Sequence, residues 1–164
     1  MAIKLIYATN IDRIMGRNGR LPWYIPEDLK HFQQLTVGCP VIMGSRTWES
    51  LPGKQRPLKN RMNIVLTRNE HVKYPGAIIK HSLEEALQEA KTMNSKDIWI
   101  IGGANVLKQS MKLAETLHVT VINNKISGDV KSPVIDLEVF KLTHQEPMRK
   151  SGMYNYQFLT YNKK

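Results

Sequence analysis

The sequence predicts an α/β protein built on a mostly parallel sheet that is covered by helices on both faces. Short, continuous apolar runs alternate along the chain with segments of helical character. Such uninterrupted runs are typical of strands buried on both faces of a parallel sheet. The last part of the chain has strand-like runs with no helix between them, which indicates an antiparallel edge. We therefore expect one domain over residues 1–164.

The first elements follow from apolar runs and from one proline. Residues 3–8 are apolar and predict a strand, and residues 10–21 contain two glycines and predict a loop. A helix is expected over 26–36. Pro26 suits its first position, because the fixed φ of proline fits a helix and its missing N–H would have no partner there anyway.

The middle of the chain contains two more apolar runs and one clear helix start. The expected elements here are a buried-type strand over 40–44, a short helix over 46–50 and a strand over 62–67. Ser82 and Glu85 have the spacing of a capping box, in which a serine and a glutamate each satisfy the other's backbone N–H. A helix is therefore expected from this point to about Met93.

The last third is expected to complete the sheet. Its predicted elements are a strand over 98–101, a Gly-Gly turn, a helix over 104–111, a strand over 117–121 and a late pair of strands over 137–142 and 154–161. No repeat, low-complexity tract or internal linker interrupts this order.

Composition favours a cytoplasmic, monomer-sized domain. Hydrophobic residues make up 41% and charged residues 23% of the chain, as in ordinary globular proteins. No apolar run is long enough to span a bilayer, and the first residues read as a strand rather than a signal peptide. Cys39 is the single cysteine and cannot form an intrachain disulfide, which agrees with a reducing compartment.

The formal net charge of +10 favours small anionic ligands over nucleic acid. Lys and Arg are scattered, and the nearest approach to a cluster is the segment 54–61. Scattered cations are more typical of a solvated face that attracts phosphates or carboxylates of small molecules. A metal site is not expected, because the five histidines form no ligand-spaced pair. No serine or cysteine nucleophile motif occurs either.

Asp28 is the first candidate functional residue. It lies in the first turn of the helix over 26–36, with Phe32 one turn later on the same face and Trp23 just upstream. An acid on the apolar side of a helix is costly unless a polar group docks there, which favours a binding role. The alternative is an acid that faces water and is stabilised by the helix dipole. This segment by itself leaves both interpretations open.

Two strand-to-helix turns are candidate anion sites. Gly102 and Gly103 follow one apolar strand, and Gly44 followed by Ser45, Arg46 and Thr47 ends another. Ligands of open α/β sheets lie beyond the carboxyl ends of the strands, where glycine lets a phosphate approach the backbone. No G-x-G-x-x-G motif is present, and a Gly-Gly pair alone is also compatible with a simple tight turn. Together with Asp28, the two turns predict a cleft for two ligands.

These motifs form an ordered set along most of the chain. The set comprises the strand 3–8, Asp12-Arg13-Ile14-Met15-Gly16, Leu21-Pro22-Trp23, Pro26-Glu27-Asp28-Leu29, Phe32, Val41-Ile42-Met43-Gly44, Arg46-Thr47-Trp48-Glu49-Ser50, Arg56-Pro57-Leu58, Arg61-Met62-Asn63, Ile100-Ile101-Gly102-Gly103, Thr120 and Gly128-Asp129. In this order and with these gaps the chain resembles the dihydrofolate reductase family as far as Phe158. The resemblance implies a mainly parallel sheet of eight strands with an antiparallel C-terminal strand and four flanking helices.

The resemblance also implies an activity, the NADPH-dependent reduction of 7,8-dihydrofolate to 5,6,7,8-tetrahydrofolate. The product supplies one-carbon metabolism, and enzymes of this family are targets of antifolates. The implied catalytic residues are Asp28, Trp23 and Thr120. Asp28 would accept hydrogen bonds from the 2-amino and N3 groups of the pterin, Trp23 would hold a bridging water, and Thr120 would bond the carboxylate. Burial raises and the helix N-terminus lowers the pKa of such an acid, so the net shift stays open here.

For the substrate, the resemblance implies a pterin pocket, an apolar channel and a carboxylate clamp. The implied binding residues are Ile6, Tyr7, Asp28, Phe32, Leu51, Leu58, Arg61 and Thr120. Arg61 would hold the α-carboxylate of the glutamate tail in a bidentate pair, which guanidinium geometry favours over lysine.

For NADPH, the resemblance implies three contact regions and a lid. The implied residues are Ala8, Met15, Gly16, Leu21, Gly44, Ser45, Arg46, Thr47, Leu66, Thr67, Arg68, Ile101, Gly102, Gly103, Ala104, Asn105 and Val106. Thr67 and Arg68 would lie near the 2′-phosphate, and the Gly-Gly bond would be cis. The loop 10–21 would close over the nicotinamide, with Gly128 and Asp129 supporting its closed form.

Three positions depart from the common pattern, and two other functions stay open. Leu107 stands where many relatives have tyrosine, and Ser45 stands where some relatives have a basic residue. Tyr7 replaces a small residue beside the pterin, so its side chain either narrows the pocket or turns outward.

One alternative function is that of a reductase of the same fold acting on a riboflavin-precursor aminopyrimidine. The other is a non-enzymatic basic binding module, which only the net charge favours.

Overall fold

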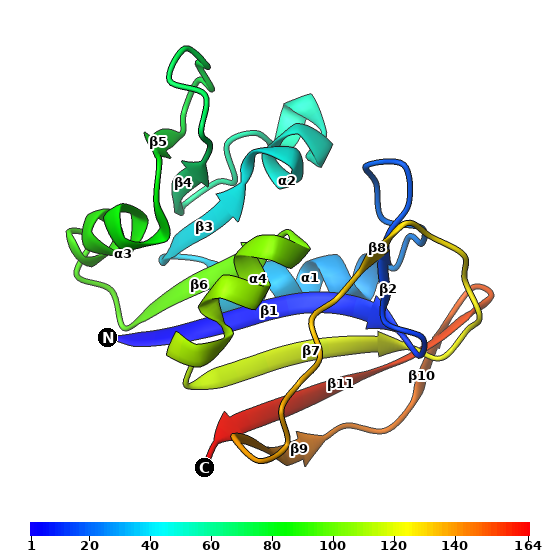
Figure 1. Ribbon diagram of the computed structural model, residues 1–164. Coiled ribbons are helices and arrows are strands. Elements are labelled where there is room, and N and C mark those ends of the chain that lie inside the picture. The colour runs from blue at the N-terminus through cyan, green and yellow to red at the C-terminus, as the bar shows by residue number, and fades with distance from the viewer.

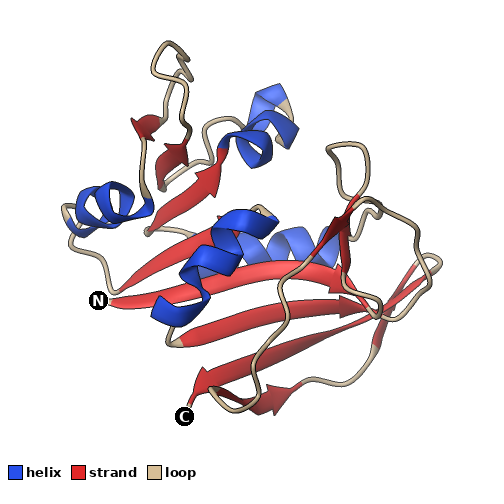
Figure 2. Cartoon of the chain, viewed as in Figure 1, coloured by secondary structure: helices blue, strands red, loops and turns tan.

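A central mixed sheet carries helices on both of its faces (Figures 1 and 2). The computed structural model describes residues 1–164. Its strands are β1 (Ala2–Asn10), β2 (Ile14–Gly16), β3 (Pro40–Gly44), β4 (Met62–Leu66), β5 (Ile78–Lys80), β6 (Asp97–Gly102), β7 (Thr116–Ile122), β8 (Val130–Lys131), β9 (Phe140–Gln145), β10 (Arg149–Ser151) and β11 (Tyr154–Lys163). Its helices are α1 (Pro26–Thr36), α2 (Ser45–Ser50), α3 (Leu83–Lys91) and α4 (Ala104–Ser110), with 3₁₀ turns η1 (Gly53–Gln55) and η2 (Met111–Leu113).

The sheet is parallel over most of its width. The strands run in the order β5-β4-β3-β6-β1-β7 with parallel pairing throughout, and β11 then joins β7 antiparallel. Both β9 and β10 pair antiparallel with β11, so they form one interrupted edge strand. Counted in this way, the sheet has the eight strands, the antiparallel C-terminal strand and the four helices that the resemblance implies.

The two sheet faces bury separate clusters. Leu5, Ile42 and Ile100 pack under α3 and α4, where Leu107 is fully buried. The opposite face carries α1 and α2, and its cluster contains Trp48 together with the other residues Ile6, Val41, Met43, Leu58, Val65 and Trp99. Continuous apolar strands are therefore explained by burial on both sides.

Local signals placed most elements correctly, and long-range pairing decided the rest. The side-chain oxygen of Ser82 accepts a hydrogen bond from the Glu85 backbone N–H at 3.1 Å, which confirms the serine half of the capping box. The Glu85 carboxylate accepts from the Ser82 hydroxyl at 3.1 Å and not from its backbone N–H. The strand β9 begins at Phe140 rather than at residue 137, because Asp136 organises a turn: its carbonyl accepts from the Phe140 N–H at 2.9 Å. The short strands β2, β5, β8 and β10 were not predicted.

No helix has the length and apolarity needed to cross a membrane. No group of three or more His, Cys, Asp or Glu side chains is arranged to hold a metal ion.

A polar cluster around His118 on β7 makes the free energy of unfolding depend on pH. His118 packs against the Trp99 ring at 5.3 Å, beside the ion pair between Lys4 and Asp97 at 3.3 Å. Burial first, then Lys4 and His31, lower the pKa of His118 from 6.5 to about 4, against the opposing charge of Asp97.

We expect His118 to destabilise the protein in acid. Between pH 6.5 and about 4 the unfolded chain binds a proton at this residue that the folded protein resists, so stability is complete above this window and falls as pH drops through it. Across this pH window, the free energy of unfolding of the His118→Gln variant should fall by about 1–2 kcal/mol less than that of the parent. Urea unfolding of both proteins near neutral pH and near pH 4 measures this, and parallel losses would contradict it.

Candidate functional site

The Asp28 side chain on α1 is hydrogen-bonded to β7 in the central sheet. Ile25 precedes α1 in an extended conformation, and Pro26 occupies the first turn. The Thr120 hydroxyl on β7 donates a hydrogen bond to the Asp28 carboxylate at 2.6 Å, and Thr120 itself is buried. Asp28 is only partly exposed. The acid therefore faces the sheet, and the alternative of a solvent-facing carboxylate is wrong.

The surroundings of Asp28 favour its neutral form more than water does. Burial raises the pKa of this carboxyl, and the hydrogen bond from Thr120 opposes the rise. The net shift is upward, which answers the question left open by the sequence. A buried acid with one hydroxyl donor still has acceptor positions free for N–H groups of a ligand.

Trp23, which precedes α1 in the chain, has an unpaired buried polar atom. The side chain is 6% exposed and packs with Ile122, Tyr156 and Phe158, but its indole N–H donates to no protein atom. A buried donor without a partner costs about 1–3 kcal/mol, so this N–H is suited to a water or a ligand.

The residues expected to line the channel belong to one apolar cluster on the sheet face that α1 covers. Ile6 and Leu58 are buried there, and Phe32 and Leu51 pack against their cluster. The Arg61 guanidinium lies 5.6 Å from the Phe32 ring. The structure therefore brings these five predicted residues to one side of the sheet.

Arg61 is held from two directions, which leaves part of its guanidinium free. Its Nε donates to the Lys59 carbonyl at 2.9 Å and one terminal nitrogen donates to the Thr36 hydroxyl at 3.1 Å. Asn63 shapes this segment: its side chain accepts from the Leu58 N–H at 2.9 Å and donates to the Arg61 carbonyl at 3.0 Å. The positioning role of Asn63 was missed, although an amide inside a buried strand run was a usable signal.

The side chain of Tyr7 is not part of this channel, so of the two alternatives it turns away from the pocket and does not narrow it. Tyr7 packs with Leu5 under the opposite face, and burial raises its pKa. Its register partner is Val119, whereas Ala8 pairs with Thr120. Successive residues of a strand point to opposite faces, so a one-residue step separates Tyr7 from the Asp28 side.

The two glycine turns meet at the carboxyl ends of their strands. A methyl group on Gly102 would lie 3.5 Å from the Thr47 hydroxyl oxygen, and one on Gly103 would lie 3.6 Å from it. A methyl group on Gly44 would lie 3.4 Å from Val106. The peptide bond between the glycines is cis, as expected. Gly102 has φ +126°, a conformation that a side chain would strain.

A third turn follows the neighbouring strand. Leu66 pairs with Gly44 in register, which places Thr67 and Arg68 just beyond the end of β4. The Thr67 N–H donates to the Lys80 carbonyl at 3.1 Å, and the Thr67 carbonyl lies 2.8 Å from His81 Nδ1. Arg68 is exposed, so its guanidinium is free to meet an anion.

The remaining predicted residues lie at the rims of this region. Ile101 packs with the channel cluster, while Met15 packs against the cluster on the other face. Ser45 and Ala104 are partly buried at the starts of α2 and α4. Arg46, Asn105 and Leu21 are exposed.

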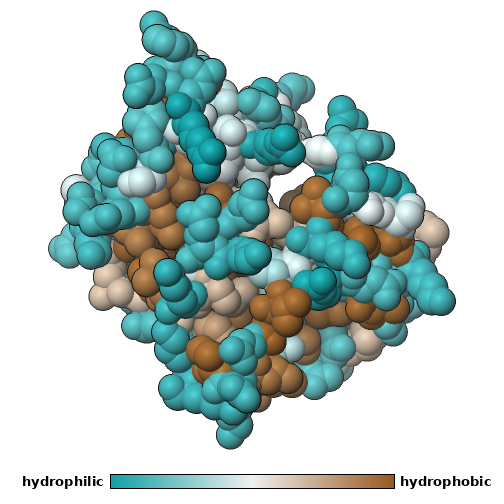
Figure 3. Space-filling view, viewed as in Figure 1, coloured by the Kyte–Doolittle hydropathy of each residue, from teal (hydrophilic) through white to brown (hydrophobic).

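The expected lid is joined to a support segment. β2 pairs antiparallel with β8. The Asp129 N–H donates to the Gly16 carbonyl at 3.0 Å, and the Asn18 N–H points at the Asp129 carboxylate at 3.3 and 3.4 Å. A methyl group on Gly128 would lie 2.5 Å from the Gly16 carbonyl oxygen, so only glycine fits. Figure 3 shows the surface notched between the α2 end of the molecule and this segment.

Comparisons with known proteins agree with this geometry. A family model described as dihydrofolate reductase matches residues 2–163. The dihydrofolate reductase of Mycobacterium tuberculosis is 36% identical over 98% of both chains, and that of Bacillus subtilis is 34% identical over 99% of this chain and 95% of its own. A solved structure, dihydrofolate reductase from Enterococcus faecalis complexed with NADP(H) and RAB-propyl, covers 99% of this chain and 96% of its own at 31% identity and a TM-score of 0.88.

Proposed function

The chain belongs to the dihydrofolate reductase family, and from this premise we propose how its own residues perform the reaction. It is an NADPH-dependent oxidoreductase that reduces 7,8-dihydrofolate to 5,6,7,8-tetrahydrofolate, the product that one-carbon metabolism uses. NADPH supplies a hydride to C6 of the pterin, a proton adds to N5, and NADP⁺ leaves. The comparisons do not favour the riboflavin-precursor alternative.

The observation that carries the proposal is the bond between Thr120 and Asp28 at 2.6 Å, on the sheet face that carries the apolar cluster of Ile6 and Leu58. Asp28 accepts hydrogen bonds from the 2-amino and N3 groups of the pterin with its remaining lone pairs. This fixes the ring and increases the basicity of N5. Thr120 holds the carboxylate in place, and its hydrogen bond opposes the rise in the Asp28 pKa that burial causes.

Trp23 completes the pterin end of the site. Its unpaired indole N–H supports a role in holding a water between the side chain and the substrate. The residue is otherwise fixed by packing with Tyr156 and Phe158, so its donor points in one direction.

The channel and Arg61 bind the rest of the substrate. Ile6, Phe32, Leu51 and Leu58 form apolar walls for the p-aminobenzoyl ring. Arg61 pairs with the α-carboxylate of the glutamate, because two of its nitrogens are already oriented by Lys59 and Thr36.

The glycine turns fit NADPH. The open approach to Gly44, Gly102 and Gly103 around the Thr47 hydroxyl suits a pyrophosphate that contacts backbone N–H groups. The same cradle includes Ser45, Ala104, Asn105 and Val106, with Ala8, Met15, Gly16, Leu21 and Ile101 toward the nicotinamide and Leu66 toward the adenosine.

A direct assay tests the function. Loss of NADPH absorbance on addition of 7,8-dihydrofolate is expected, with no loss when dihydrofolate is omitted. A parallel reaction with a riboflavin-precursor aminopyrimidine should show no turnover. Turnover of the aminopyrimidine alone would overturn the proposal.

We propose that Arg46 and Arg68 set the preference for NADPH over NADH, in place of the basic residue that Ser45 replaces. Both side chains are exposed next to the phosphate turns. Replacing both by Gln should lower the ratio of kcat/KM for NADPH to that for NADH by about 10–100-fold. The reason is that each substitution removes a guanidinium that contacts the 2′-phosphate, which NADH lacks. Lys150→Gln on β10 is the matched control. An unchanged ratio in the double variant would remove both residues from this role.

We further propose a monomeric, cytoplasmic protein of one domain over residues 1–164 that does not bind nucleic acid. One sheet extends from β1 to β11, which supports a single domain. Sedimentation at micromolar concentration tests the monomer.

A further inference from the structure

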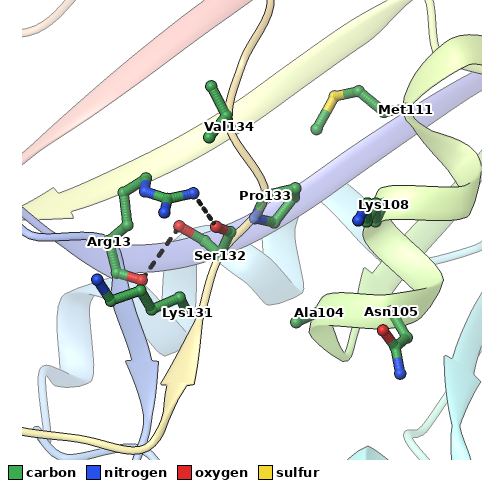
Figure 4. Close-up of a pocket in the computed structure, with 9 residues that line it drawn as sticks. All are labelled: Arg13, Ala104, Asn105, Lys108, Met111, Lys131, Ser132, Pro133 and Val134. Atoms are coloured by element: carbon green, nitrogen blue, oxygen red, sulfur yellow. Dashed lines mark hydrogen bonds between the residues drawn. The ribbon is translucent and has the colours of Figure 1, made fainter.

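A cavity whose lining does not include Asp28 lies between α4, the turn after β1 and the segment that follows β8 (Figure 4). Its volume is about 450 Å³, within the range of small-molecule sites. The lining residues are Arg13, Ala104, Asn105, Lys108, Met111, Lys131, Ser132, Pro133 and Val134.

Three cations from three separate segments line this cavity, and no acid does. Arg13 follows β1, Lys108 lies on α4 and Lys131 ends β8. None of the three forms an ion pair. Figure 4 shows Arg13 and Lys131 on one side of the cavity and Lys108 on the other. Like charges around one cavity repel, and a bound anion would relieve that repulsion.

The cation at Arg13 is fixed by its surroundings. Its guanidinium donates to the Ser132 carbonyl at 2.9 Å, and the Ser132 N–H donates back to the Arg13 carbonyl at 2.8 Å. Asn10 holds the turn, because its side-chain oxygen accepts from the Ile14 N–H at 2.7 Å. An oriented guanidinium loses little freedom when it binds a ligand.

The cavity also has an apolar wall, made by Met111, Pro133 and Val134. Val134 is 68% exposed, so this wall is open to a ligand. A purely inorganic anion would leave the wall unused. The combination suits a molecule with an anionic head and a small apolar body.

We propose that this cavity binds a small organic phosphate, with its phosphate among Arg13, Lys108 and Lys131 and its apolar part against Met111, Pro133 and Val134. The site goes beyond the reductase activity. Ala104 and Asn105 border both this cavity and the proposed cofactor cradle, so the test must be made with NADPH bound. Because Lys131 pairs with Ile14 between β8 and β2, a ligand here connects the base of the lid to α4.

The test is calorimetric titration of phenyl phosphate into enzyme saturated with NADPH. Saturable binding is expected. The double variant Lys108→Gln and Lys131→Gln should weaken it at least about tenfold, since it removes two of the three cations at exposed positions. Lys141→Gln, an exposed lysine on β9, is the control and should bind as the parent does. Dihydrofolate turnover of each variant checks that it is folded.

Three results would overturn the proposal: no saturable binding, binding that disappears as NADPH saturates the enzyme, or equal weakening in Lys141→Gln. A parallel titration with inorganic phosphate shows whether the site prefers an organic phosphate or binds any phosphate ion. Tighter binding of phenyl phosphate supports an organic phosphate, and equal binding would overturn the role of the apolar wall.

Discussion

Replacing Asp28 by Asn is expected to lower kcat/KM for dihydrofolate at neutral pH by about 100-fold or more. The amide keeps an oxygen that accepts from Thr120, so the hydrogen bond at 2.6 Å has a near-isosteric replacement. It loses the charge that orients the pterin and makes N5 more basic. The variant should recover part of its activity as pH falls and the substrate arrives already protonated. Steady-state rates across pH measure both effects.

The stability of the same variant separates lost chemistry from lost folding. Burial raises the pKa of Asp28, so the ionised carboxyl is unfavourable in the folded protein at neutral pH. Removing that charge should leave the Tm at neutral pH equal to or above that of the parent. Glu27→Gln, at the exposed neighbouring position, is the control and should keep full activity. Full activity of Asp28→Asn at neutral pH would exclude Asp28 from its role.

Replacing Arg61 by Lys is expected to raise KM for dihydrofolate by about 10–100-fold with a smaller change in kcat. Lysine cannot form a bidentate pair with the glutamate carboxylate, and it also loses the orienting bonds to Lys59 and Thr36. A contact far from the reacting atoms contributes equally to substrate and transition state, so its loss appears mainly in KM.

A substrate without the glutamate tail provides the internal control for Arg61. With 7,8-dihydropteroate, the parent and Arg61→Lys should have similar KM values. A variant that loses affinity for both substrates to the same extent would show that Arg61 shapes the channel rather than binds the carboxylate. Kinetics with both substrates distinguish these outcomes.

Several helices and strands could be predicted from the sequence because their signals involve only neighbouring residues. Helix α1 was predicted over its full observed length, Pro26–Thr36, because proline marks its start. The strand Pro40–Gly44 was also predicted with its observed bounds, since an apolar run ending in glycine depends only on neighbours in the chain. The two glycine turns were placed by the same kind of signal.

Other features depended on partners far along the chain. The strand β5 has three residues and exists because β4 offers a parallel edge. β2 formed within the predicted loop because β8, more than a hundred residues later, pairs with it. The cavity of Arg13, Lys108 and Lys131 has no sequence signature, because it joins segments that only the fold brings together.

The sequence by itself determined the fold class, the positions of most helices and strands, and the residue types of the site. Caps, glycines and apolar runs act through neighbouring residues, so they can be read without the fold. The resemblance already implied the bond between Thr120 and Asp28 that the structure contains. Only the tertiary structure decided that Tyr7 lies on the other face and that the pKa of Asp28 rises. Each of these depends on which strands pair and in which register, and burial and hydrogen bonding follow from that pairing.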